Sequence, residues 1–196
     1  MPQPITIIGA PVLRSAARPL GREEILTPAI QQLIELMRET MRAAPGVGLA
    51  APQIDLPLQL AVIEDRAEYQ KDIPPAQLAD RERKVVDFHV IVNPVLTLEP
   101  GTPVEFFEGC LSLPGFVALV PRARAVRVEC LDHRGKHQTI RARGWYARIL
   151  QHEVDHLGGT LYVDRMHTRT LCTVDHYSAH WKSMPIESLK TALKIN

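Results

Sequence analysis

The most informative stretch of the chain reads Gln-His-Glu-Val-Asp-His-Leu-Gly-Gly over residues 151–159. His152 and His156 are four residues apart, so on a helix both imidazoles share one face and can bind the same metal ion. Glu153 lies one residue off that face, where its carboxylate can reach a water on the metal without being a ligand. This H-E-x-x-H arrangement predicts two metal ligands and a general base. The alternative is a helix with two surface histidines.

The motif helix is expected to cover about residues 145–157 and to end at the glycine pair 158–159. Apolar side chains fall on more than one of its faces, which is typical of a helix buried between sheets. A second helix is predicted from Thr27, as N-cap, and Pro28 to a point before Pro45. Its apolar residues recur at helical spacing and predict a core-facing side: Ile30, Leu33, Ile34, Met37 and Met41.

The rest of the chain alternates apolar runs with turn residues, which is typical of antiparallel strands. Residues 1–20 are predicted to be an extended arm, residues 46–53 a tight turn, and residues 64–83 a surface loop with room for a short helix. A C-terminal amphipathic helix is indicated by Ile186, Leu189 and Leu193. The predicted strands cover residues 58–63, 89–98 with a turn or bulge at Pro94, 104–107, 116–120, 125–131, 136–142 and 161–163.

Composition sets broad limits on the class of protein. The 196 residues suffice for one domain with a real core. A net charge of +1 gives no reason to expect a nucleic-acid or membrane surface. No apolar run approaches the roughly 20 residues that a membrane span needs. The start of the chain lacks a secretory pattern, although removal of an organelle-targeting segment stays open. Three cysteines without a secretion signal argue against a disulfide framework.

A catalytic metal needs a third protein ligand, which this sequence supplies in only a few places. A metzincin would place a histidine at position 162, which is Tyr162, and the only glutamate after the motif is Glu187 in the tail. Cys110, in a tight Glu-Gly-Cys segment, is the better candidate, because a thiolate is a strong, soft ligand. The alternative is a buried structural thiol. Cys130 is interpreted as an ordinary apolar residue, and a second site at Cys172 and His176 is disfavoured.

At this point three segments together resemble the signature motifs of the peptide deformylase family. They are GVGLAAPQ at residues 46–53, EGCLS at 108–112 and QHEVDHL at 151–157, and they stand in the family's order. The resemblance covers about residues 5–170 and leaves a tail of about 171–196. Residues 143–149 further resemble the plant and animal organellar branch. The family implies a single α+β domain over residues 1–196, with a central metal-binding helix wrapped by antiparallel sheets.

The resemblance implies a metal-dependent hydrolase that removes the N-formyl group from the formyl-methionine of newly made polypeptides and releases formate. Its metal ligands would be Cys110, His152 and His156. One divalent ion is expected, Fe²⁺ in cells, with Zn²⁺, Ni²⁺ or Co²⁺ in purified protein. Glu153 would be the general base, and the oxyanion would be held by the Gln53 side chain and the Leu111 backbone N–H.

Substrate-binding residues follow from the same resemblance. Val47 and Ile149, together with His152, are expected to line a pocket for the methionine side chain, and Gly46, Gly48 and Gly109 to keep the site small enough for a formyl group. Two positions depart from bacterial members of the family: Val117 stands where some have an arginine that contacts the peptide, and Arg148 stands where they have an aliphatic residue. Arg148 could narrow or gate the pocket. Glu108 and Arg122 are predicted either to form an ion pair or to leave Arg122 solvated.

Partners and location follow from the expected reaction. The substrates would be N-formyl-methionyl nascent peptides, in the bacterial cytoplasm or, alternatively, in a mitochondrion or plastid. A ribosome contact through the C-terminal helix is compatible with the family. The protein could be a monomer or a homodimer. No specific nucleic acid and no membrane are expected as partners. Three other interpretations remain: a zinc endopeptidase, a non-catalytic metal- or peptide-binding protein, and a structural zinc site, which would need four protein ligands.

Overall fold

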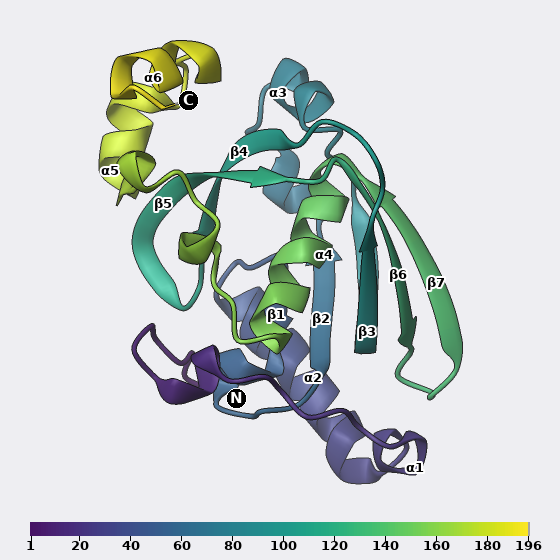
Figure 1. Ribbon diagram of the computed structural model, residues 1–196. Helices are drawn as coiled ribbons and strands as arrows, with labels where there is room; N and C mark the ends of the chain where they lie inside the picture. The colour runs from purple at the N-terminus through teal and green to yellow at the C-terminus, as the bar shows by residue number, and fades with distance from the viewer. Residues whose placement is uncertain (196) are drawn as a thin grey trace.

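The computed structural model describes residues 1–195, which form two antiparallel sheets and the helices that cover them (Figure 1). The larger sheet has the strand order β1-β2-β3-β6-β7 and the smaller one β4-β5-β8. The expected α+β class is confirmed. The strands are β1 (Gly48–Ala50), β2 (Leu60–Asp65), β3 (Val86–Leu98), β4 (Val104–Cys110), β5 (Leu113–Arg122), β6 (Ala125–Leu131), β7 (His137–Arg143) and β8 (Cys172–Thr173).

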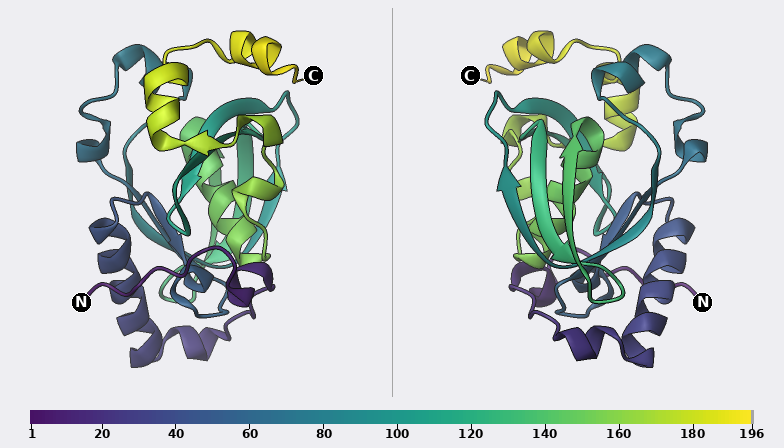
Figure 2. Two further views of the ribbon diagram at one scale, coloured as in Figure 1. Left: turned by 90° about the vertical axis from the view of Figure 1, so that its left-hand side faces the viewer. Right: turned by 90° about the vertical axis from the view of Figure 1, so that its right-hand side faces the viewer.

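Helices pack on both faces of the larger sheet, and the N-terminal arm and the C-terminal helices lie at opposite ends of the molecule (Figure 2). None of the helices within residues 1–195 has the length and apolar character that crossing a bilayer requires. The α-helices are α1 (Arg22–Ile25), α2 (Pro28–Ala43), α3 (Pro75–Asp80), α4 (Gly144–Leu157), α5 (Val174–His176) and α6 (Ile186–Leu193). Shorter helical turns cover Pro11–Arg14, Ala51–Ile54, Ala67–Gln70, Tyr162–Asp164, Thr168–Thr170 and, as a π-helix, Tyr177–Trp181.

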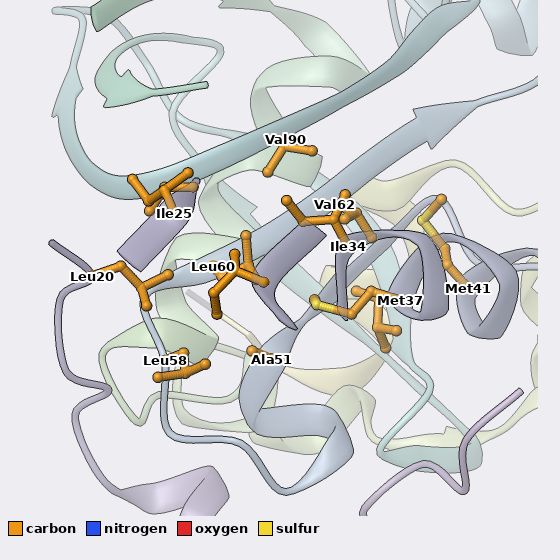
Figure 3. Packing of buried hydrophobic residues seen from close by; sticks show 13 residues of the cluster. Leu20, Ile25, Ile34, Met37, Met41, Ala51, Leu58, Leu60, Val62 and Val90 are labelled. Carbon is orange, nitrogen blue, oxygen red and sulfur yellow. The ribbon is translucent and has the colours of Figure 1, made fainter. Parts of the chain in front are cut away.

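Alternating side chains of β2 decide which helix packs on which face. Leu60 and Val62 belong to a buried cluster with α2, whereas Ala61 and Ile63 belong to a cluster with α4. Successive strand residues point to opposite faces, so the two helices cover opposite sides of the sheet. Figure 3 shows the α2 side of this core, where the following labelled side chains gather: Ile34, Met37, Met41, Leu60, Val62 and Val90.

The predicted helix boundaries are confirmed at both long helices. The Thr27 side chain accepts a hydrogen bond from the backbone N–H of Ile30, with Pro28 in the first turn of α2. Helix α4 ends at Leu157, and Gly159 then takes a positive φ of 75°. A Cβ at Gly159 would lie 2.8 Å from the backbone of Arg14, so glycine permits the N-terminal arm to pass close to the end of α4.

Strand β3 carries the irregularity that the sequence predicts beside Pro94. Asn93 has a positive φ of 51°, and the pairing register with β6 shifts between Val92 and Val95. The Asn93 amide holds the backbone of Leu20 through two hydrogen bonds, of 2.9 and 2.8 Å. The bulge therefore ties the N-terminal arm to the sheet.

The sequence interpretation is wrong at several short segments. Residues 161–163 are not a strand: Asp164 folds back and accepts a hydrogen bond from the Leu161 N–H at 2.8 Å, which makes a helical turn. The supposed tight turn at 46–53 contains β1, which pairs with β2, and a further helical turn. The short helix α1 and the helical segment 174–181 were not expected.

Candidate metal centre and its cavity

Two elements bring the three predicted ligands together. His152 and His156 lie on one face of α4 with ring centroids 4.9 Å apart. Cys110, at the end of β4, places its Sγ 3.3 Å from His156 Nε2. One donor atom from each of the three residues lies within 4.8 Å of the others, and within residues 1–195 no other group of three His, Cys, Asp or Glu side chains meets in this way.

The chemistry of this donor set fits a divalent metal ion. His156 is 1% exposed and its Nδ1 has no hydrogen-bond partner, and burial keeps its pKa well below the ordinary histidine value, so that it is neutral and able to bind metal. Cys110 Sγ accepts a hydrogen bond from the backbone N–H of Ser112 at 3.4 Å, which fixes the position of the sulfur. Two imidazoles and one thiolate are a ligand set for zinc, iron(II), cobalt or nickel, with a coordination position left open.

The Glu108 carboxylate orients the first histidine. His152 Nδ1 lies 3.2 Å from Glu108 Oε2, which directs the Nε2 of the same ring towards the other ligands. The carboxylate also accepts two hydrogen bonds of 3.0 Å from Arg122 and one of 2.6 Å from Arg148. Burial opposes its charge, but the hydrogen bonds from His152 and Arg122 prevail and hold the pKa of Glu108 well below its ordinary value.

Arg122 and Arg148 are both buried, so the solvated alternative for Arg122 is wrong and the predicted ion pair is confirmed. Arg122 also contacts Asp155, which is paired in turn with Arg165. Arg148 donates to the carbonyl oxygens of Val120 and Val104 at 2.9 and 2.7 Å. An arginine held at three points is fixed in the wall of the site, which does not support the expectation of a movable gate.

Glu153 lies beside the three ligands in a tightly packed position. Its side chain is 3% exposed, its Oε2 has no hydrogen-bond partner, and burial raises its pKa to about 7. The Glu153 side chain occupies the space beside Gly48, where a Cβ would lie 2.1 Å from Glu153 Oε1. A buried carboxyl group with a raised pKa is suited to accept and return a proton near neutrality.

Gln53 presents its amide to the same site. Its Oε1 accepts a hydrogen bond from the Ala50 N–H at 2.9 Å, which directs Nε2 towards Ser112 Oγ at 3.2 Å and Cys110 Sγ at 3.6 Å. Leu111 follows Cys110 in the turn between β4 and β5. A Cβ at Gly46 would lie 2.8 Å from Leu111 Cδ1, so a larger residue there would require the Leu111 side chain to shift.

A cavity of about 610 Å³ opens beside these residues. Val117 and Arg148, the two positions that depart from bacterial members of the family, both line the cavity. Apart from His156, every predicted site residue lines it: Val47, Gly48, Gln53, Gly109, Cys110, Leu111, Ile149, His152 and Glu153.

Other lining residues were missed by the sequence analysis. Phe107 and Phe116 come from β4 and β5, Arg83 from the segment interpreted as a surface loop, and Val174 from the tail. Ser112 was quoted only as a motif residue, although its hydroxyl accepts a hydrogen bond from Gln53. No local pattern marks Val174, because the tail reaches the cavity through tertiary contacts such as the pairing of β5 with β8.

The fold and the site together define a class: an α+β protein with a Cys-His-His metal centre on an H-E-x-x-H helix. The model of a family described as polypeptide deformylase matches residues 2–171. The chain therefore belongs to the polypeptide deformylase family.

Relatives occur among organellar and bacterial proteins. The chain is 49% identical to peptide deformylase 1A, chloroplastic/mitochondrial, of Arabidopsis thaliana over 172 residues, which is 88% of this chain and 64% of the plant protein. It is 42% identical to peptide deformylase 3 of Streptomyces avermitilis, covering 98% and 84% of the two chains. A Met-Ala-Ser-bound class I type b peptide deformylase from Acinetobacter baumannii superposes with a TM-score of 0.75 at 30% identity, over 85% of this chain and 99% of that one. The chain thus spans less than two thirds of the plant relative.

Proposed function

We propose that this chain is one peptide deformylase domain that hydrolyses the N-formyl group of formyl-methionyl peptides to formate and a free amine. The observation that carries the proposal is the position of Glu153, a buried carboxyl group with an unpartnered oxygen, in the wall of the cavity that Cys110 and His152 also line. Family membership supports the same reaction.

The proposed metal ligands are Cys110, His152 and His156, with Glu108 orienting His152. A divalent ion held there would act as a Lewis acid, which polarises a carbonyl and makes water more acidic. Glu153 accepts a proton from the water that attacks the formyl carbon, and it then delivers that proton to the departing amine nitrogen. A general base of this kind commonly contributes about 10²–10⁴ in rate.

The oxygen of the formyl group gains negative charge as water adds to its carbon. The proposed donors to this oxygen are Gln53 Nε2 and the backbone N–H of Leu111. Gln53 is preorganised by its bond to the Ala50 N–H, so its amide does not have to reorient during the reaction. Loss of one such donor commonly lowers kcat by about 10²–10³.

The cavity supports a formylated methionine as the substrate. Gly48 and Gly109 add no side chain to the cavity, and Glu153 fills the space beside Gly48, so little room is left near the carboxylate; this favours a formyl group over larger acyl groups. Val47 and Ile149 supply apolar surface for a methionine side chain. The related Acinetobacter baumannii structure is described as bound to Met-Ala-Ser, the product that deformylation of formyl-Met-Ala-Ser would leave.

Formate release from formyl-Met-Ala-Ser by protein purified without oxygen and reloaded with Fe²⁺ tests the proposal. Turnover is expected in the wild type and in Cys130→Ala, because Cys130 is a buried core thiol on β6 that does not line the cavity. Cys110→Ala and Glu153→Ala are expected to abolish it. Absence of turnover with Fe²⁺, Ni²⁺ and Co²⁺ alike, or undiminished turnover in Glu153→Ala with metal bound, would contradict the proposal.

We further propose Fe²⁺ as the cellular metal, with Zn²⁺, Ni²⁺ or Co²⁺ as substitutes in purified protein, since a thiolate and two imidazoles suit all four ions. Metal analysis of protein isolated without oxygen tests this point. The substrates are nascent chains of a formyl-methionine translation system, in the bacterial cytoplasm or in an organelle. A ribosome contact and a choice between monomer and homodimer stay predictions.

A further inference from the structure

Part of the cavity wall lies beyond residue 171, where the match to the family model ends. Val174 lies three residues beyond the end of the match at residue 171, yet it lines the same cavity as Cys110 and Glu153. Phe116 of β5 lines it as well, and its partner in the strand pairing is Thr173, the residue before Val174. Both apolar side chains are partly open to solvent, 42% for Val174 and 41% for Phe116.

The tail that carries Val174 is fixed to the body of the protein. The ring of Phe107 in β4 lies 4.5 Å from that of Tyr177 and 6.0 Å from that of Trp181, as centroid distances. Further along, Lys190 Nζ pairs with Glu105 at 2.8 Å and Leu189 is fully buried. Figure 1 shows α5 beside β5, with α6 beyond it. These contacts hold the segment that carries Val174 in place beside the cavity.

We propose that Val174 and Phe116 form a contact site for a substrate residue downstream of the methionine and select an apolar side chain there. This inference rests on the proposed function. An extended peptide advances about 3.3–3.6 Å per residue, so a substrate with its formyl end at Glu153 must follow the cavity wall as it leaves. Val117, the next residue of the same strand, is a third apolar residue that lines the cavity.

Charge exchange at Val174 tests the inference. The substrates are formyl-Met-Ala-Ala-Ala peptides with Leu, Asp or Lys at position 2, 3 or 4. At one of these positions the wild type is expected to favour Leu. Val174→Asp is expected to lower kcat/KM for that Leu peptide about tenfold, through KM, and to favour Lys over Asp. Val174→Lys is expected to show the opposite preference, for the Asp peptide over the Lys peptide. A loss of protein stability would not reverse the preference between two substrates.

Met184→Asp is the matched control, because Met184 is a tail residue of similar exposure, 38%, that does not line the cavity. It is expected to keep the wild-type preferences. Formyl-methionine amide, which lacks downstream residues, is measured with every variant, and each peptide's kcat/KM is divided by that value so that only effects on the downstream residues are compared. The inference alone would be overturned if the wild type turns the peptides over and both Val174 variants rank the Leu, Asp and Lys peptides in the wild-type order at all three positions. No turnover of any peptide by the metal-loaded wild type would overturn the proposed function, and this inference with it.

Discussion

At the scale of single residues, Gly48 shows most directly how the backbone shapes the reaction site. A Cβ at this position would lie 2.1 Å from Glu153 Oε1, closer than non-bonded atoms can approach. Gly48→Ala is therefore expected to displace the carboxylate and to lower kcat for formyl-Met-Ala-Ser about 10²-fold, the lower end of what a general base supplies. The three metal ligands are untouched, so metal content should stay at the wild-type level.

Gly21→Ala is the control for this change, because no atom lies within 4 Å of a Cβ built at Gly21. Its turnover is expected to match that of the wild type. A metal-loaded Gly48→Ala protein with more than a third of wild-type kcat would show that the Glu153 carboxylate is not held against Gly48 during the reaction.

Arg148 is a second residue whose role follows from its contacts. It is a buried cation that joins Glu108 to carbonyl oxygens on β4 and β5, and burial lowers its pKa to about 10. Arg148→Leu leaves those acceptors without a donor and should reduce the unfolding free energy of the metal-free protein by about 2–4 kcal/mol in urea titrations. Arg127→Leu, which removes a partly exposed ion pair with Glu129, should cost less than about 1 kcal/mol. Equal losses in the two variants would contradict the assignment.

At the scale of elements, local patterns predicted some pieces and not others. Helix α2 and the β6–β7 hairpin follow the periods of 3.6 and 2 in their apolar residues, and both are confirmed. A three-residue apolar run such as 161–163 carries no period, and there Asp164 decides in favour of a turn. Strand β8 has only two residues, so its existence depends on pairing with β5 and could not be predicted from its own sequence.

The ion pair between α2 and β2 gives an expected pH dependence. Arg42 donates to both carboxylate oxygens of Glu64, at 2.7 and 2.6 Å, and these hydrogen bonds lower the pKa of Glu64 against the opposing effect of burial. A lowered carboxyl pKa in the folded state stabilises the protein above the unfolded value of about 4.5, and this contribution is lost as the pH falls through the folded value. Because Arg42 is partly exposed, the contribution is expected to be roughly 0.5–1 kcal/mol.

Urea unfolding of Glu64→Gln and the wild type at pH 7 and at pH 3.5 measures this contribution. The difference between the two proteins should be largest at pH 7 and should shrink at pH 3.5. Glu129→Gln, at an exposed position, should show little difference at either pH. A Glu64→Gln difference that grows on acidification would have the wrong sign for a lowered pKa.

At the scale of the whole molecule, the centre of the site was predictable and its surroundings were not. Cys110, His152 and His156 belong to short motifs whose residue types carry their chemistry, so they could be named before any fold was known. The charges around Glu108 come from separate elements, and a sequence does not show whether Arg122 is solvated or buried. The tail's place at the cavity likewise depends on tertiary packing.

Metal binding should also couple the two sheets, since Cys110 comes from β4 of the smaller sheet and the histidines from α4, which packs on the larger one. An ion that binds only the folded state adds about 4 kcal/mol at a free concentration 1,000 times its Kd. For a chain of this size each kcal/mol raises Tm by about 2–4 °C, so saturating Zn²⁺ should raise Tm by about 8–16 °C in thermal scans. Cys110→Ala should lose most of this shift. Cys130→Ala should keep it, because Cys130 does not belong to the ligand set and lies in the core of the larger sheet. An equal Zn²⁺ shift in Cys110→Ala would mean that the thiolate is not a ligand and that the ion does not join the sheets.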